Sequence, residues 1–241
     1  MSCLICKKYL TTNLNPHNPK TLCLMFHGIN GESGYTNISK IPFIYSDKLI
    51  SDVNYQSDLF KSYVKSFHKV FTDEGMKNLY LYSEITGVGK TFTASAILNE
   101  FNVFFFLTKY KNGEKIIDLP SYFLDVTELQ EIYNKFNRSN IDKGVALEAS
   151  KEYYKRLELA SKAILVCFDD LGVRECTEAF RGDLHKVINH RSVNKLTSIY
   201  TSNFTIDNLI KIYDKRIYDR VRDKTAIISF SEVNKSYRKE L

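Results

Sequence analysis

The stretch that most constrains the fold runs from Leu79 to Thr91 and reads LYLYSEITGVGKT. Its aromatic and aliphatic first half is typical of a buried strand, and it breaks into a turn that contains Gly87 and Gly89. Because glycine has no Cβ, the backbone N–H groups of such a turn can curl around an anion. The sequence therefore predicts a strand, a phosphate-binding loop and a helix, in that order.

The helix expected from Lys90 to Glu100 directs its positive N-terminal end at the same loop. In this arrangement Lys90 reaches the β- and γ-phosphates of a nucleotide, and the Thr91 hydroxyl is a ligand for Mg²⁺. The backbone of Gly87-Val88-Gly89 supplies the N–H groups around the phosphates. We therefore expect ATP and Mg²⁺ as the cofactors.

One position departs from the pattern G-x-x-x-x-G-K-[ST]. Glu84 stands where the first glycine is expected, which puts a carboxylate and a Cβ at the turn from strand to loop. Weakened nucleotide affinity is the expected consequence. The alternative for the whole stretch is a glycine-rich turn that binds nothing, and the order of strand, turn, Lys-Thr and helix argues against it.

Two carboxylates follow a second apolar run, Ala163 to Phe168. At a strand end beside a phosphate loop, Asp169 would hold Mg²⁺ directly or through water, and Asp170 would orient the attacking water. The alternative is that the two Asp residues only cap a helix or a turn. The strongly apolar run before them favours the nucleotide site.

A third polar strand end and a pair of arginines complete the candidate site. Asn203 follows the apolar run Thr197 to Thr201, where its amide would sense the γ-phosphate or position water. Arg216 and Arg220 are four residues apart, so they lie on one face of a helix. They would either pair with Asp residues on that surface or project into the nucleotide of a neighbouring subunit.

The order of elements predicts an α/β fold. Alternating strands and helices imply a parallel sheet with the phosphate site at its carboxyl edge. The expected strands are 79–82, 103–108, 163–168, 197–201 and 226–230, with a short strand at 41–45. The expected helices are 56–71, 90–100, 126–136, 145–161, 177–194 and two short ones carrying Arg216 and Arg220.

Several motifs in this order resemble one family. They are Gly87 to Thr91, Asp169-Asp170-Leu-Gly172, Ile188-Asn-His-Arg191, Thr201-Ser-Asn203, Lys215 to Arg220 and Ser236-Tyr-Arg238. The chain resembles the AAA+ ATPases of the DnaC/DnaI type, the replicative-helicase loaders, and their IstB relatives. From about Ile41 onward, the resemblance implies a P-loop AAA+ core with a five-stranded parallel sheet flanked by helices, without a C-terminal lid domain.

The resemblance also implies roles for individual residues. Lys90 and Thr91 correspond to the first Walker motif of the family, and Asp169 and Asp170 to the second. Asn203 corresponds to sensor 1, Arg216 resembles the arginine finger with Arg220 as the alternative, and Arg238 resembles the sensor-2 arginine.

The first residues differ in character from the rest. Cys3, Cys6, Cys23 and His27 form C-x₂-C followed by C-x₃-H, a spacing typical of a tetrahedral zinc site. A segment this short cannot build its own apolar core, so a metal would stabilise it. The alternative is that these are ordinary thiols. We expect a small zinc-knuckle-like module and linker at 1–40, and the ATPase domain at 41–241.

The 241 residues carry a formal charge of +6 and contain no apolar run long enough to span a bilayer, which takes roughly 18 residues. We therefore expect a cytoplasmic protein without membrane contact. A basic face around Lys135, Arg138 and Lys143 would touch DNA, or it is only a solvated helix surface. The exposed aromatics expected to stack on DNA bases are Tyr110 and Tyr122.

The leading functional prediction is an ATP-dependent helicase loader. It would form homo-oligomers through ATP sites between subunits, bind a hexameric replicative helicase through the N-terminal module, and bind single-stranded DNA. The compact size favours a bacteriophage or mobile-element version acting in a bacterial cytoplasm. The alternatives are a transposition helper ATPase of the IstB kind, and a hydrolysis-deficient adaptor that binds the helicase.

Overall fold

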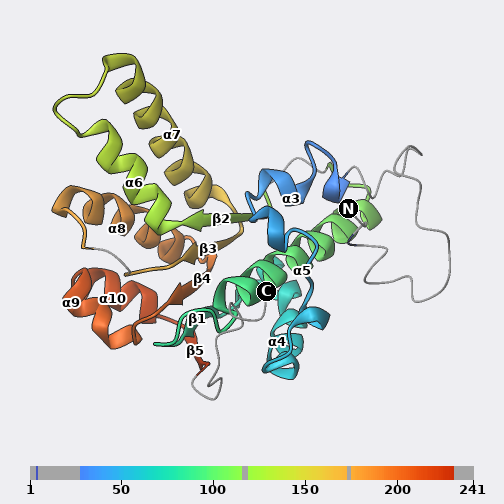
Figure 1. The fold of residues 1–241 in the computed structure, drawn as a ribbon. Helices are drawn as coiled ribbons and strands as arrows, with labels where there is room; N and C mark the ends of the chain where they lie inside the picture. Colours follow the sequence, from blue (N-terminus) through green and yellow to red (C-terminus); the bar gives the residue numbers. More distant parts are fainter. Residues whose placement is uncertain (1–3, 5–27, 116–118, 173–174, 231–241) are drawn as a thin grey trace.

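A computed structural model of the chain describes residue 4 and residues 28–115, 119–172 and 175–230 (Figure 1). The predicted zinc ligands Cys3, Cys6, Cys23 and His27 lie outside these ranges, and so does Arg238. Zinc binding and the sensor-2 role therefore stay predictions. Among the residues that are described, no helix is both long enough and apolar enough to cross a membrane.

The described residues form one parallel sheet of five strands. The strands are β1 (Asn78–Tyr82), β2 (Ser121–Asp125), β3 (Leu165–Asp169), β4 (Thr197–Ser202) and β5 (Thr225–Ser229). Their order across the sheet is β2-β3-β4-β1-β5, and every neighbouring pair is parallel. All carboxyl ends therefore lie at the same edge, and the predicted α/β architecture is confirmed.

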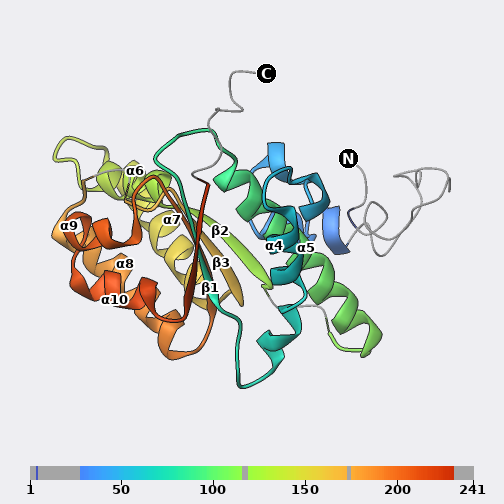
Figure 2. The same ribbon diagram turned by 90° about the horizontal axis from the view of Figure 1, so that it is seen from below.

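Helices cover both faces of the sheet (Figure 2). On one face lie α3 (Tyr35–Ile38), α4 (Ser57–Val64) and α5 (Lys90–Lys111). On the other lie α6 (Val126–Phe136), α7 (Lys143–Lys162), α8 (Glu178–Val193), α9 (Leu209–Ile212) and α10 (Lys215–Arg222). Short 3₁₀ turns occur at Phe43–Tyr45, Ile50–Asp52, Phe67–Phe71 and Ile206–Asn208.

The side chains of β1, β2, β3 and β4 divide between two apolar cores. In β1, Leu79 and Leu81 point toward α5, and Tyr80 points toward the helices of the other face. This alternation follows from the two-residue period of a strand. Because both faces are covered, β1 is aliphatic or aromatic from Leu79 to Tyr82, which is the pattern that identified it in the sequence.

The predicted strand at 103–108 is wrong, because these residues belong to α5. The helix expected to end at Glu100 continues to Lys111, and Phe101, Phe105 and Phe106 on it are buried. The fifth strand is instead β2, whose polar first and last residues, Ser121 and Asp125, hid it. A five-stranded sheet was predicted correctly, but one of its five strands was placed wrongly.

The segment before β1 also differs from the expectation. Residues 41–45 form no strand, and the predicted helix 56–71 divides into α4 and a 3₁₀ turn. In residues 28–40, which belong to the predicted N-terminal module and linker, Ile29 and Tyr35 are buried. The Tyr35 ring contacts the rings of Phe105 and Phe106 with centroids 6.2 Å apart. This segment therefore packs on the C-terminal half of α5.

Candidate nucleotide-binding site

The loop between β1 and α5 has the backbone that the glycines predicted. Gly87 and Gly89 have φ values of 78° and 97°, in the left-handed region that disfavours residues with a Cβ. A Cβ on Gly89 would meet no atom within 4 Å, so the requirement at this position is conformational rather than steric crowding. The loop leads directly into α5, whose first residue is Lys90.

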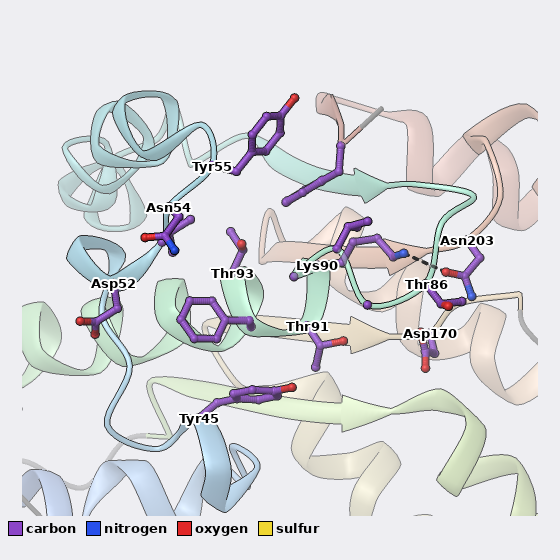
Figure 3. A pocket seen from close by; sticks show the side chains of 16 residues that line it. Tyr45, Asp52, Asn54, Tyr55, Thr86, Lys90, Thr91, Thr93, Asp170 and Asn203 are labelled. Carbon is purple, nitrogen blue, oxygen red and sulfur yellow. Dashed lines mark hydrogen bonds between the residues drawn. The ribbon is translucent and has the colours of Figure 1, made fainter. Parts of the chain in front are cut away.

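Lys90 joins the loop to the end of β4 (Figure 3). Its ammonium group donates to Asn203 Oδ1 at 2.8 Å and to the carbonyl oxygens of Ser83 and Ile85 at 3.1 and 3.2 Å. The residue is 6% exposed. Two residues that are 113 positions apart and were predicted to share a site are thus in direct contact.

The Asp169 carboxylate is held by two hydroxyl groups. Thr91 Oγ1 donates to Asp169 Oδ2 at 3.2 Å, and Thr201 Oγ1 donates to Asp169 Oδ1 at 2.6 Å. Burial raises the pKa of Asp169 to about 7, while the hydrogen bond from Thr201 acts in the opposite direction. A cation beside this carboxylate would favour its ionised form. Thr91 and Asp169, which were both predicted as Mg²⁺ ligands, are thus in contact.

Asp170 is the next residue and faces the pocket. It has φ of 55°, which is unusual for a residue with a side chain. Its backbone N–H donates to Thr201 Oγ1 at 2.9 Å. Thr201 therefore contacts both predicted aspartates, although the sequence analysis gave it no role beyond membership of a motif.

Of these residues, Lys90, Thr91, Asp170 and Asn203 line one end of an open pocket of about 360 Å³. Figure 3 shows Lys90, Thr86, Asp170 and Asn203 at this end. The full lining is Tyr45, Asp52, Val53, Asn54, Tyr55, Thr86, Gly87, Val88, Gly89, Lys90, Thr91, Phe92, Thr93, Asp170, Asn203 and Phe230. A volume of this size falls within the range of small-molecule sites, roughly 300–1,000 Å³.

The other end of the pocket is aromatic, and the sequence analysis missed it. Tyr45 meets Phe92 edge-on with ring centroids 5.7 Å apart, and Tyr55 contacts Phe230 at 5.6 Å. These rings come from a 3₁₀ turn, a loop, α5 and the end of β5. No local motif links them, because only the packing of the segment before β1 onto α5 brings them together.

Glu84, the departure from the loop pattern, lies outside the pocket lining. Its side chain is exposed, and Tyr82 donates its hydroxyl to Glu84 Oε1 at 3.0 Å. Burial, followed by this hydrogen bond and the nearby negative charge, raises the pKa of Tyr82. The carboxylate is thus held beside the strand end instead of facing the phosphate-binding residues.

The two predicted arginines do not reach the pocket of their own subunit. No residue of α10 belongs to the lining. The Arg216 guanidinium donates to Asp214 Oδ2 at 3.0 Å, and Asp214 also caps α10 by accepting from the Ile217 N–H. Arg220, one turn further along α10, is exposed.

The chemistry of the donor groups fits a metal-bound triphosphate. Backbone N–H groups and an ammonium suit phosphate oxygens, and a hydroxyl beside a carboxylate suits Mg²⁺, which takes few protein ligands. Among the described residues, no group of three or more His, Cys, Asp or Glu residues could hold a metal ion.

The fold is similar to that of solved DNA-replication proteins. For DnaI, the TM-score is 0.54 at 21% sequence identity, covering 80% of this chain and 92% of that one. For the DnaC helicase loader, it is 0.53 at 18% identity, covering 78% and 98%. For the replication initiator DnaA bound to AMPPCP and single-stranded DNA, it is 0.51 at 13% identity, covering 79% and 50%.

The sequence matches no protein-family model and no curated protein. At these sequence identities, the likeness to solved structures establishes the fold. The five parallel strands with flanking helices form an α/β core similar to the cores of these solved structures. The resemblance to the DnaC and DnaI loaders, first indicated by the order of motifs, is thus confirmed at the level of the fold.

Proposed function

We propose that this chain binds and hydrolyses ATP with Mg²⁺ and loads a replicative DNA helicase. One observation carries the proposal: Lys90, Thr91, Asp170 and Asn203 line one end of a pocket whose other end is aromatic, and Thr91 also donates to Asp169. The charged end suits a triphosphate with its metal, and the aromatic end suits a nucleobase. The fold shared with DnaI and DnaC supports the loader role.

Each polar residue at the charged end has a chemical role in the proposal. Lys90 supplies positive charge to the β- and γ-phosphates, while Thr91 and Asp169 hold Mg²⁺. Asp170 orients the attacking water, and Asn203 contacts the terminal phosphate or that water. When bound, Mg²⁺ neutralises charge that develops on the phosphoryl oxygens.

The test of the ATPase is hydrolysis by the purified chain, with and without single-stranded DNA. We expect Lys90→Ala to lower hydrolysis by roughly 10²-fold or more, since it removes a charged group that contacts the reacting phosphate. Lys186→Ala is the matched control, because its side chain is 80% exposed and lies on α8. A parent protein that neither binds nor hydrolyses ATP would contradict the proposal.

The proposed partner is a hexameric replicative helicase. Residues 1–40 would dock it, with zinc held by Cys3, Cys6, Cys23 and His27. The test is retention of a purified hexameric helicase by the full chain on a size-exclusion column, beside the zinc content of the chain by elemental analysis. A transposition helper would not retain the helicase, so this outcome separates the two ATPase candidates.

Single-stranded DNA is the second proposed partner, and α6 and α7 offer a surface for it. The two helices form a hairpin that extends from the sheet (Figure 1). Lys135, Arg138 and Lys143 are exposed around its tip. Along α7 they are continued by Lys151 and Lys155, which share a helix face with the 56% exposed ring of Tyr154.

This surface combines cations for the DNA backbone with a ring for base stacking. Of the two stacking residues predicted from the sequence, Tyr122 is buried in β2 and cannot stack on DNA. Tyr154 takes its place in this proposal. Tyr110 is half exposed at the end of α5, where it stacks on Phe106 with ring centroids 6.2 Å apart. We expect Tyr154→Ala to weaken binding of a fluorescent oligonucleotide, with Tyr110→Ala as the comparison.

The ATP site is proposed to be completed by a second copy of the chain. A developing charge on the γ-phosphoryl group is stabilised by an external cation. Within one subunit, the α10 residues Arg216 and Arg220 are absent from the pocket lining. Either guanidinium is therefore available to the nucleotide of a neighbouring subunit in a homo-oligomer.

A further inference from the structure

Thr201 is a fully buried hydroxyl residue between the two aspartates of the site. It lies on β4 next to β3, where Phe168 pairs with Tyr200. Asp169 follows Phe168 on β3 and Thr201 follows Tyr200 on β4, so Thr201 lies beside Asp169. Thr201 does not line the pocket, so it acts only through the residues that it contacts.

The Thr201 hydroxyl makes two hydrogen bonds of opposite sense. It donates its single proton to Asp169 Oδ1 at 2.6 Å, and it accepts the Asp170 N–H at 2.9 Å. A hydroxyl has one proton to donate, so these two contacts fix its orientation. The shorter distance is typical of a hydroxyl bonded to an ionised carboxylate.

Both contacts determine the geometry of groups in the proposed catalytic site. With Oδ1 held by Thr201, the other carboxylate oxygen of Asp169 is directed at Thr91, 3.2 Å away. The bond to the Asp170 N–H helps to hold that backbone at φ of 55°, a left-handed conformation that is unfavourable for a residue with a Cβ. One hydroxyl thus orients the carboxylate of Asp169 and the backbone of Asp170.

We infer that Thr201 is a positioning residue of the ATP site, which orients Asp169 toward the Mg²⁺ bound with the nucleotide. The inference rests on the proposed function, and it adds β4 to the elements that hold the metal. Without the hydroxyl, Asp169 is free to rotate, and the metal loses an oriented acceptor. In the absence of the metal, the nucleotide is bound by Lys90 and by the loop that contains Gly87 and Gly89. Loss of the Thr201 hydroxyl therefore leaves this metal-independent binding unaffected.

The test compares Thr201→Val, which keeps the shape but lacks the hydroxyl, with Thr201→Ser, which keeps the hydroxyl. Thr197→Val is the matched control, because Thr197 is buried at the opposite end of β4. The readout is the Kd of a fluorescent ATP analogue in EDTA and in Mg²⁺. The ratio of these two constants measures the contribution of the metal, independently of turnover.

We expect Mg²⁺ to tighten binding for the parent, Thr201→Ser and Thr197→Val alike. For Thr201→Val, we expect the EDTA value to stay within about twofold of the parent value and the gain from Mg²⁺ to fall by about tenfold. A merely structural role would lower stability and leave the ratio unchanged. If Thr201→Val does not fold, Thr201→Cys replaces it, since a thiol is a weak donor.

The role of Thr201 and the ATP site itself would be contradicted by different results. A parent that binds the analogue more tightly with Mg²⁺, together with a folded Thr201→Val that shows the same gain, overturns the role of Thr201 and leaves the ATP site standing. A parent that binds no analogue in either buffer overturns the proposed ATP site, and the role of Thr201 falls with it.

Discussion

Arg191 shows how one side chain can hold several elements together. It is 1% exposed, and within the part of the chain that the structure describes none of its hydrogen bonds goes to a carboxylate. Its guanidinium donates to Ser198 Oγ and to the carbonyl oxygens of Ala160, Ala163, Ile164 and Thr197. Burial lowers the pKa of Arg191 to about 9, which still leaves it charged at neutral pH. The contacts tie the ends of α7 and α8 to the starts of β3 and β4.

Arg191→Met should therefore destabilise the whole protein. The substitution keeps an apolar stem but leaves several buried carbonyl groups without a donor, which we expect to lower the free energy of unfolding by roughly 3 kcal/mol. Urea denaturation followed by circular dichroism measures the change. Arg138→Met, at the exposed tip of the α6–α7 hairpin, should stay within about 0.5 kcal/mol of the parent. Equal stability of the two variants would contradict the account.

Glu84 leads to a prediction about binding rather than stability. Because Tyr82 holds its carboxylate outside the pocket lining, restoring the glycine of the loop pattern should change little. We expect the Kd of Glu84→Gly for an ATP analogue to lie within about twofold of the parent value, equivalent to roughly 0.4 kcal/mol. A gain of tenfold or more would mean that the carboxylate reaches the phosphates, as the sequence alone suggested.

At the level of elements, α5 and β2 show where sequence patterns lose information. The sheet covers one side of α5 and residues 28–55 cover the other, so its Val103-Phe104-Phe105-Phe106 run has no polar face and reads as a buried strand. Strand β2 begins with Ser121 and ends with Asp125, so it reads as a loop. Its end did carry a signal, because Asp125 caps α6 by accepting from the Glu128 N–H.

The predictable parts of the candidate site are those that directly follow an apolar strand. The phosphate loop and the Asp169-Asp170 pair each follow an apolar strand, and a parallel sheet brings such strand ends together. No comparable rule predicts which residues form the aromatic end of the pocket. It depends on buried Asn99 of α5, which donates to the carbonyl oxygens of Tyr45 and Lys48 at 2.8 Å and so fixes the 3₁₀ turn against the helix.

That turn offers a matched pair of substitutions for the aromatic end. Tyr45 lines the pocket against Phe92, whereas Phe43, two residues earlier on the same turn, is 79% exposed and does not line it. We expect Tyr45→Ala to weaken binding of an ATP analogue by about tenfold, roughly 1.4 kcal/mol, through the loss of an aromatic contact. Phe43→Ala should bind like the parent. Isothermal titration calorimetry measures both, and similar losses in the two variants would count against a base-binding end.

At the scale of the whole molecule, the position of α10 leads to a test of assembly. If Arg220 completes the ATP site of a neighbouring subunit, Lys90→Ala and Arg220→Ala damage different halves of one interface. Each variant alone should hydrolyse ATP poorly, whereas a mixture should recover activity, because some interfaces then combine an intact loop with an intact arginine. A steady-state phosphate-release assay measures this recovery. The same mixture with Arg216→Ala identifies which arginine acts, and no recovery in either mixture would contradict an intersubunit site.

The helix α5 also gives the molecule a mechanical property. It has 22 residues and is therefore about 33 Å long, with the phosphate loop at one end and the Phe105 and Phe106 rings that hold Tyr35 toward the other. Because most of α5 is packed on both sides, the helix would move as a rigid body. A tilt of about 5° about the loop end would displace the far end of the helix by about 3 Å. Tyr35 packs on that half of the helix, so such a tilt would displace the segment that carries it.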